Sequence, residues 1–332
     1  MTEYDRPHLS FADQIALMEA RGLDCSGCDA AQALARIGYY RLSAYTYPFR
    51  QMLGPNEMSE SPVQYRAAEF ATGYQLSDAL ALYDFDYGLR VLSAEALKIV
   101  EVGLRVQVAY VLGQRDRFGH LERAALDADA CSETAPDGDG DMFEFWTRRY
   151  LKLKRQAQAE DFVQHYILKY DGRLPVWVAV ETLDFGGVIR LFSLLDRNDQ
   201  NTIARSWGVK DGRKLHKWLL ALGTLRNHCA HHSRLWNRNL TYAIGRFAPA
   251  IVDPELAHIA QHPHPKKLYP ALAILAYLAI RIDPRSNWPR SMRTKVKKKF
   301  PAISGLSPES DMGFPASWAE ESLWNYEPPK KV

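Results

Sequence analysis

The spacing of apolar residues along the chain predicts a protein built mainly from helices. The longest signal covers residues 76–115, where apolar side chains recur at the intervals of an amphipathic helix and no proline interrupts. Shorter helices are expected over residues 9–23 and 29–38, because Ser10 and Asp29 stand at positions that favour N-capping. The N-terminal part of the chain is therefore expected to be helical as well.

Further helical patterns follow in the second half of the chain. The expected segments are residues 142–170, 202–209, 211–225, 240–262 and 268–282. Pro175 also begins an apolar stretch that we interpret as helix–turn–helix, with its break at Gly186-Gly187. There is no internal repeat, and the predicted fold class is all-α.

Glu101 and Arg105 stand four residues apart in the longest predicted helix, so they are expected to share one face. Such a pair is often a surface ion pair of small energetic value. The alternative is a carboxylate that orients a catalytic arginine or histidine from a neighbouring helix. The pattern alone leaves both interpretations open.

Several segments carry other patterns. Residues 37–50 contain four Tyr and one Phe, interleaved with Arg41 and Arg50. These aromatic side chains either stack on nucleic-acid bases or, as we expect, form an aromatic wedge in the core. Residues 51–65 are expected to be a connection, and residues 304–332 to be loosely ordered.

Residues 127–141 are acidic and rich in turn-forming residues. Their alternate aspartates have the spacing of a calcium loop, but Met142 and Arg148 stand where such a loop needs Gly and Glu. We therefore expect an exposed loop that does not bind calcium.

The composition is that of an ordinary globular protein, with 47% apolar and 24% charged residues. The net charge of +3, from 42 basic and 39 acidic residues, is too small to identify a nucleic-acid binder by itself. Neither a signal peptide nor a membrane span is expected. Four cysteines in so long a chain favour a reducing cytoplasm, and Cys25 and Cys28 form a lone CxxC that two half-buried loop residues explain more simply than a metal.

Groups that transfer protons or bind anions concentrate in one stretch, residues 225–238 (LRNHCAHHSRLWNR). It holds three His, three Arg, two Asn and one Cys. An apolar helical pattern runs into it, and reactive polar groups at such a place are costly to desolvate unless they are paired or used. This stretch, called the motif below, is therefore the candidate functional site.

Two interpretations of the motif involve no RNA. His228 and His232 have a zinc-like helical spacing with Cys229 adjacent, but no third ligand is evident. Cys229 as a nucleophile is less favoured, because its neighbours would crowd a substrate. Alternatively, the Arg and His side chains pair with Glu101 or Glu181 and only hold helices together.

The third interpretation is metal-independent RNA cleavage. It needs groups that take a proton from the ribose 2′-OH and return one to the leaving 5′-oxygen, and histidine suits either role, while arginine holds the phosphate. Asn227 and His231 are four residues apart and share a helical face, whereas Arg226 lies about 140° from His231 at ~100° per residue. One motif supplies one such histidine, so two copies of the chain are expected to complete a site, which predicts a homodimer.

Several blocks of the sequence resemble one family. Arg226-Asn227-x-x-x-His231 is similar to the RxxxxH motif of the HEPN superfamily of ribonucleases. The whole motif resembles the Abi-like proteins of the AbiD/AbiF type, which act in abortive infection. The blocks LSFADQIALMEARGL, IGYYRLSAYTYPFR, LYDFDYGLRVLSAEALKIVEVGLR and PVWVAVETLDFGG match the same family in the same order, so the resemblance covers most of the chain.

The resemblance implies an all-helical fold with a HEPN-like domain over residues 76–285, into which the loop 127–141 is inserted. Residues 1–70 would form an N-terminal helical extension with the aromatic block. Residues 286–332 would form a basic and then loosely ordered segment. The implied activity is that of a toxin-like ribonuclease, a hydrolase of phage defence that is silent until infection.

The resemblance also implies roles for individual residues. Arg226 and His231 carry over as the catalytic pair, and Asn227 matches the polar residue that often follows the arginine. Glu101 and Arg105 carry over as supporting groups. Around them we expect His228 and His232 as further supporting residues, and Arg234, Arg238, Arg293, Lys297, Lys298 and Lys299 as RNA contacts. No metal and no cofactor are expected.

RNA is the expected partner, as substrate and, as in some relatives, as a bound small structured RNA; neither DNA nor a membrane is expected. Residues 286–299 carry six Lys or Arg and no acid, so they form either a solvated tail or an arm that tracks phosphates. The alternative function is a non-catalytic RNA-binding module that holds a cognate small RNA and signals to a partner.

Overall fold

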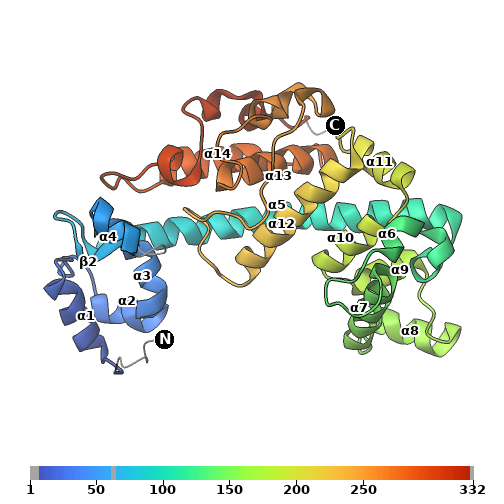
Figure 1. Cartoon of the computed structure of the whole chain (residues 1–332), viewed down its shortest axis with the longest axis horizontal. Coiled ribbons are helices and arrows are strands. Elements are labelled where there is room, and N and C mark those ends of the chain that lie inside the picture. Colours follow the sequence, from blue (N-terminus) through green and yellow to red (C-terminus); the bar gives the residue numbers. More distant parts are fainter. Residues whose placement is uncertain (1–6, 61–64, 330–332) are drawn as a thin grey trace. The chain divides into compact units, whose positions relative to one another are not determined.

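The computed structural model describes residues 7–60 and 65–329, and helices dominate them (Figure 1). The predicted all-α fold class is confirmed. The described chain divides into two compact units, of which the first comprises the residues up to Leu89 together with Lys298–Ser307. The second comprises Arg90–Lys297 and the residues from Pro308 onward.

The first two predicted helices are confirmed. Helix α1 (Phe11–Ala20) begins after Ser10, whose side chain forms a reciprocal capping box with Asp13. Helix α2 (Ala30–Ile37) begins after Asp29, whose carboxylate accepts the N–H of the third residue that follows it. The short polar caps therefore determine where both helices start.

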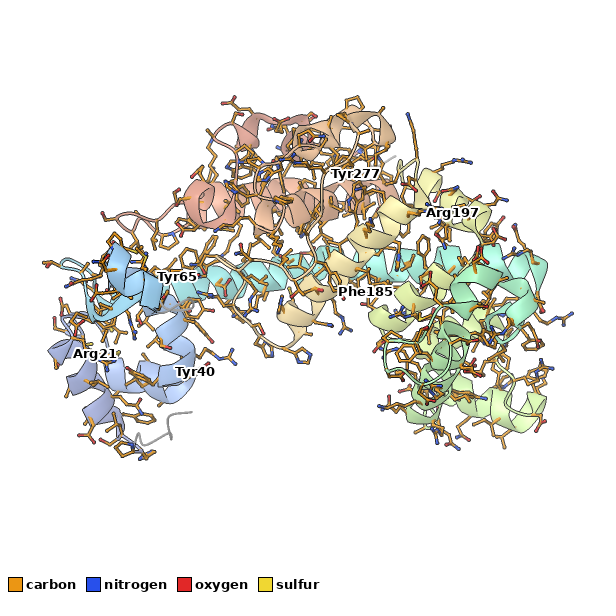
Figure 2. The ribbon with its side chains drawn as sticks, viewed as in Figure 1. Arg21, Tyr40, Tyr65, Phe185, Arg197 and Tyr277 are labelled. Atoms are coloured by element: carbon orange, nitrogen blue, oxygen red, sulfur yellow. The ribbon has the colours of Figure 1, made fainter. Side chains whose placement is uncertain are left out.

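The aromatic block forms α3 (Tyr39–Thr46) and a 3-10 turn, Tyr47–Phe49. Tyr45 and Phe49 are buried, which confirms the expected core wedge for these two residues. Tyr40, labelled in Figure 2, is the exception, since 91% of it is exposed.

Residues 51–65 are not merely a connection. They contain most of strand β1 (Arg50–Met52) and helix α4 (Pro55–Glu60), while residues 61–64 lie outside the described part. Strand β2 (Arg66–Phe70) pairs antiparallel with β1. Strands this short contain too few residues for an alternating apolar pattern, so periodicity does not reveal them.

The long helix α5 (Leu76–Arg115) has the predicted limits. In its second half it packs against α13 (Leu268–Ile282), which is also confirmed (Figure 1). A Cβ at Gly103 would lie 2.8 Å from Cγ2 of Ile282, so the absent side chain allows the two helices to approach closely.

Residues 127–141 are not an exposed loop throughout. Asp127 caps a short helix, α6 (Ala128–Ser132), and Cys131 within it is buried. At the end of this segment, Asp141 pairs with Arg123 and caps α7. The helical segment expected over residues 142–170 is divided into α7 (Met142–Gln156) and α8 (Asp161–Tyr170). Before it, 3-10 turns cover Gly119–Leu121 and Arg123–Ala125.

The helix–turn–helix after Pro175 is present, but its break is not at Gly186-Gly187. Helix α9 (Val176–Ala179) and a 3-10 turn, Val180–Thr182, end before α10 (Phe185–Leu194). Asp184 caps α10 by accepting the Gly187 N–H at 2.7 Å, so the glycines lie inside the first turn of the helix.

Helices α11 (Arg197–Ser206) and α12 (Gly212–Ala230) follow, and α12 continues past the predicted end at residue 225. The α-helix expected over residues 240–262 is wrong. Only the 3-10 segments Pro249–Ile251 and Pro254–Ile259 form there, because the prolines remove backbone donors that an α-helix needs.

The C-terminal segments are folded, which corrects the expectation of a loosely ordered end. Residues 286–299 contain α14 (Trp288–Lys299), whose buried side chains exclude the solvated tail. After it, Phe314 and Trp324 pack against Tyr269 of α13. Short helical turns cover Pro308–Met312, Trp318–Glu320 and Ser322–Asn325. Within residues 7–60 and 65–329, no helix combines the length and apolar character needed to cross a bilayer.

Candidate functional site

The motif forms the C-terminal end of α12. The helix stops at Ala230, and the chain closes it with a Schellman motif, in which the Ser233 N–H donates to the His228 carbonyl at 2.9 Å. The His232 N–H donates to the Cys229 carbonyl at 3.2 Å. His232 adopts φ of +53°, a left-handed conformation that glycine usually occupies at this position.

This helix end changes the interpretation of the histidines. His228 lies in the last turn of α12, whereas His232 lies beyond it in left-handed backbone, so the two do not share a helical face. The zinc-like spacing therefore does not produce a pair of ligands. Among the described residues, no group of three or more His, Cys, Asp or Glu side chains is placed to hold a metal ion.

Arg226 of α12 faces α5, where Glu101 meets it. The Arg226 Nε lies 3.5 Å from the Glu101 Oε2. The other carboxylate oxygen of Glu101 accepts a hydrogen bond from Nη2 of Arg105 at 2.6 Å, and the same Nη2 donates to the Leu183 carbonyl at 2.9 Å. Glu101 thus joins an arginine on its own helix to the arginine of the motif.

This ion-pair network carries net positive charge, because two guanidinium groups share one carboxylate. The Glu101 side chain is only 13% exposed, whereas 37% of the Arg226 side chain remains exposed. The carboxylate therefore holds one edge of Arg226 and leaves the rest of the guanidinium accessible to an anion. The spacing of Glu101 and Arg105 predicted a shared face, and the structure adds the contact with Arg226.

His231 and Asn227 lie on another side of α12. The His231 N–H donates to the Asn227 carbonyl at 2.9 Å, and both side chains are exposed. His231 is the C-cap residue, so its backbone is held by the helix end while its imidazole remains accessible to a substrate. The structure thus brings an accessible histidine and an accessible arginine to the same helix end.

The side chain of His228, in the last turn of α12, is half-buried. Burial lowers its pKa, and the positive charges of Arg238 and His231 act in the same direction. Arg238 donates from Nε to the Arg234 carbonyl at 2.8 Å, so it stabilises the turn after the helix. This environment therefore favours the neutral form of the His228 imidazole.

The RNA contacts expected on α14 differ in how accessible they are. Arg293 donates from Nε to the Ala319 carbonyl at 2.9 Å, which ties α14 to the segment after it. Lys297, Lys298 and Lys299 are exposed at the end of α14. Their role as RNA contacts stays a prediction.

The cysteines considered from the sequence, Cys25, Cys28 and Cys229, do not have the environment of reactive thiols. Burial raises the pKa of Cys25 to about 11, and it also raises the pKa of Cys28. Thiols whose pKa is raised are poor nucleophiles and poor metal ligands at neutral pH. Cys229 is buried as well.

A cavity of about 250 Å³ adjoins the motif, and sequence reasoning identified Asn227 but missed the other residues that line it. Arg149 of α7, Arg190 of α10 and His216 of α12 meet there, and Asn227 forms one end. His216 precedes Asn227 by three helical turns, so helical spacing alone would have placed the two residues on the same face of α12. No sequence signal points to the arginines, because they come from helices far away in the chain.

Comparison with known protein families relates the chain to one of them. The model of a family described as Abi-like protein matches residues 32–237, a segment that includes both α5 and the Arg226–His231 pair. No curated protein and no solved structure matches the chain.

Proposed function

Since the chain belongs to the Abi-like protein family, whose general role is abortive infection in defence against phages, we propose that it is a metal-independent endoribonuclease. The observation that carries the proposal is the pairing of Arg226 with Glu101 at the same end of α12 as the exposed His231. We assign the activity to the HEPN type, in which the RxxxxH motif acts on RNA. Released in a cell, such an activity would act as a toxin.

The chemistry uses the ribose 2′-OH as the nucleophile. A histidine acts as the base that removes its proton, and the 2′-oxygen attacks the adjacent phosphorus. The bond from phosphorus to the 5′-oxygen breaks while a second group, acting as the acid, donates a proton to the 5′-oxygen. The products are a 2′,3′-cyclic phosphate and a free 5′-hydroxyl. His231 is the group assigned to proton transfer, since it is exposed and histidine titrates near neutral pH.

Arg226 is assigned to the phosphate. A guanidinium binds two phosphate oxygens at once and keeps its charge at every relevant pH. Negative charge builds up on those oxygens as the pentavalent phosphorus forms, so a positioned arginine stabilises the transition state more than the bound substrate. Glu101 and Arg105 would act as positioning residues that hold Arg226 in place before RNA binds.

A homodimer would supply the second proton-transfer group. Val102, Val106 and Tyr110 form an apolar stripe on α5 and are 44%, 56% and 64% exposed. Arg105 follows the same surface of the helix and lines one groove with Val106, Tyr110 and the half-exposed Trp177. Exposed apolar patches of this kind favour association.

The stripe also suits a second copy of the chain. With a two-fold axis through the stripe, the stripe of one protomer would contact the stripe of its partner, as in an isologous dimer. Because Arg105 borders the stripe and contacts Glu101, such a dimer would also bring the two motifs to one interface. Two copies of His231 would then be available for the two proton transfers.

The proposal is tested by incubating labelled RNA with the full-length protein in the presence of EDTA. We expect the wild type to cleave RNA, and Arg226→Ala and His231→Ala to lose cleavage while keeping the wild-type melting temperature. The matched controls are Arg205→Ala and His165→Ala, which remove exposed side chains of the same types elsewhere.

Two outcomes would reject the proposal. Cleavage at the full rate by both motif variants would refute the assignment of Arg226 and His231 to the site. Loss of cleavage on chelation would refute the metal-independent mechanism. RNA that co-purifies intact in stoichiometric amounts, without any cleavage, would favour the non-catalytic RNA-binding module instead.

A further inference from the structure

The cavity beside the motif follows one face of α12. His216, Thr224 and Asn227 line it from that helix, at spacings that keep them on one side. α7 and α10 form the opposite wall, and α10 begins at Phe185, which is labelled in Figure 2. From His216 to Asn227 the helix rises about 16 Å, at 1.5 Å per residue, which is longer than a lone phosphate needs.

Arg190 is the most unusual side chain of this cavity. It is half-buried, and the carboxylate nearest to it in effect is Glu133, which lines the neighbouring groove with it and forms no ion pair with it among the described residues. Burial lowers its pKa and the charge of Arg149 acts in the same direction, while Tyr242 and Glu133 oppose the shift only in part. A partly desolvated cation that forms no close ion pair is unfavourable, so an anion in the cavity would stabilise it.

The charge of the cavity wall favours the same kind of ligand. Arg149 is held by Asp184, with its Nη2 2.8 Å and 2.7 Å from the two carboxylate oxygens. The buried Nε of Arg149 has no hydrogen-bond partner among the residues that the structure describes. None of the lining residues is acidic, so the cavity presents two guanidinium groups and a histidine to its occupant.

The cavity also has features that suit a nucleobase. Tyr242 is 50% exposed at its rim, and Phe145 lies under the Arg190 guanidinium, 5.5 Å from its ring centre. Gly186 and Gly223 keep the walls free of side chains. The volume is slightly below the ~300–1,000 Å³ typical of small-molecule sites, as expected for one unit of a longer ligand.

The position of the cavity indicates how a strand would continue. At one end, Asn227 lies one helical turn before His231. At the other end, Arg190 and His216 also line a second groove, whose charged residues are of both signs, with Arg213 and Lys217 facing Asp127, Asp129 and Glu133. The acid-free part of this path is the cavity itself, so the phosphate of a strand that leaves the proposed cleavage site would bind there.

We infer that this cavity binds one nucleotide of the RNA strand, with a phosphate held by Arg190 and Arg149 and a base stacked against Tyr242. The inference rests on the proposed function, because it takes RNA as the ligand. The chemistry that it recognises is a phosphate ester carrying a nucleobase. A free nucleotide shares that chemistry, so the experiment must separate the two sources.

Binding is the appropriate readout, because it stays measurable whether or not RNA is cleaved. The full-length His231→Ala protein is titrated into a fluorescently labelled single-stranded RNA, and anisotropy is recorded over a range of salt concentrations. Arg190→Gln in the same background is expected to weaken binding roughly tenfold and to reduce the salt dependence by about one released counter-ion. Arg205→Gln is the control, because it removes an exposed arginine outside the cavity.

A second variant keeps the test meaningful if Arg190→Gln fails to fold. Gly186 is exposed in the first turn of α10, and a Cβ there would lie 3.4 Å from Nη2 of Arg149, an ordinary contact. Gly186→Met would therefore narrow the cavity without removing a charge. It is expected to weaken RNA binding and to leave its salt dependence unchanged.

The outcomes separate this inference from the proposed function. If the protein never cleaves RNA but both cavity variants weaken binding, the nucleotide site is retained and the ribonuclease is not. If Arg190→Gln and Gly186→Met bind RNA as tightly as their controls, the inference is wrong even where cleavage is intact. Tight binding of adenosine monophosphate that depends on Arg190, together with unchanged RNA affinity, would identify a free nucleotide as the ligand and would also overturn it.

Discussion

The Glu101 carboxylate on α5 lies between two arginines, and its Oε2 is 3.5 Å from the Arg226 Nε on α12. Because its other oxygen accepts a hydrogen bond from Arg105, the carboxylate has a defined orientation. The long helix and the motif are thereby joined at the point where we propose that phosphate binds.

Glu101→Gln tests this relationship. The amide keeps the size of the side chain but removes the charge that holds Arg226, so kcat for RNA cleavage is expected to fall about tenfold, or ~1.4 kcal/mol, with little change in KM. The control is Glu69→Gln, which removes an exposed carboxylate on β2. A purely structural Glu101 would instead lower the melting temperature and leave kcat of the folded fraction unchanged.

The apolar stripe on α5 makes a prediction about association. Val106→Glu places a charge at its centre and is expected to convert the proposed dimer into a monomer with reduced cleavage activity. Sedimentation velocity at constant protein concentration measures the change. Leu168→Glu is the control, because Leu168 is 84% exposed on α8. A Val106→Glu protein that stays dimeric, or a fully active monomer, would show that the stripe is not the dimer interface that the activity needs.

Stability in acid is expected to depend on His120. Its ring is buried, and burial lowers its pKa from 6.5 to about 4; Asp116 opposes this shift, and Lys154 and Arg173 add to it. The folded pKa lies below the unfolded one, so this stability is present above pH 6.5 and is lost as the pH falls towards about 4. The slope is at most about 1.4 kcal/mol per pH unit.

Urea unfolding at neutral pH and in mild acid measures this effect. His120→Leu is expected to flatten the dependence on pH, because the variant has no group to protonate at that position. His165→Leu removes an exposed histidine and should leave the slope unchanged. Equal slopes for wild type and His120→Leu would refute the assignment.

Local patterns predicted much of the fold, because the physical causes lie within a few residues. Ser10 and Asp29 cap the helices that they were expected to cap, and the uninterrupted apolar period of residues 76–115 yields one helix with those limits. The helix predicted over residues 240–262 failed, because the apolar spacing there is helical while the prolines prevent an α-helix.

The candidate site likewise has a part that local spacing predicts and a part that depends on contacts between distant residues. The Glu101–Arg105 face could be predicted from spacing, whereas the contact of Glu101 with Arg226 joins two distant helices. The cavity could not be predicted, since Arg149 and Arg190 come together only through the packing of α7 and α10. The left-handed His232 was also missed, because no glycine marks the end of α12.

The folded C-terminal segment predicts a large effect of a substitution far from the motif in the sequence. Trp324 is fully buried, and its Nε1 donates to the Tyr269 hydroxyl at 3.2 Å. Trp324→Ala is expected to destabilise the protein by about 3–5 kcal/mol in chemical unfolding, because it leaves a cavity and removes a hydrogen bond. Leu168→Ala should cost very little, and an equally small effect of Trp324→Ala would mean that this segment adds no stability.

The chemistry of the cut is the most direct test of the central claim that Arg226 and His231 cleave RNA through its own 2′-OH. An RNA that the wild type cleaves is compared, in EDTA, with the same strand carrying a single 2′-deoxyribose on the 5′ side of the cleaved bond, and the product ends are identified by mass spectrometry. We predict 2′,3′-cyclic phosphate and 5′-hydroxyl ends from the first strand and no cut at the substituted position of the second. Cleavage at the deoxyribose, or products with a 5′-phosphate, would contradict the account.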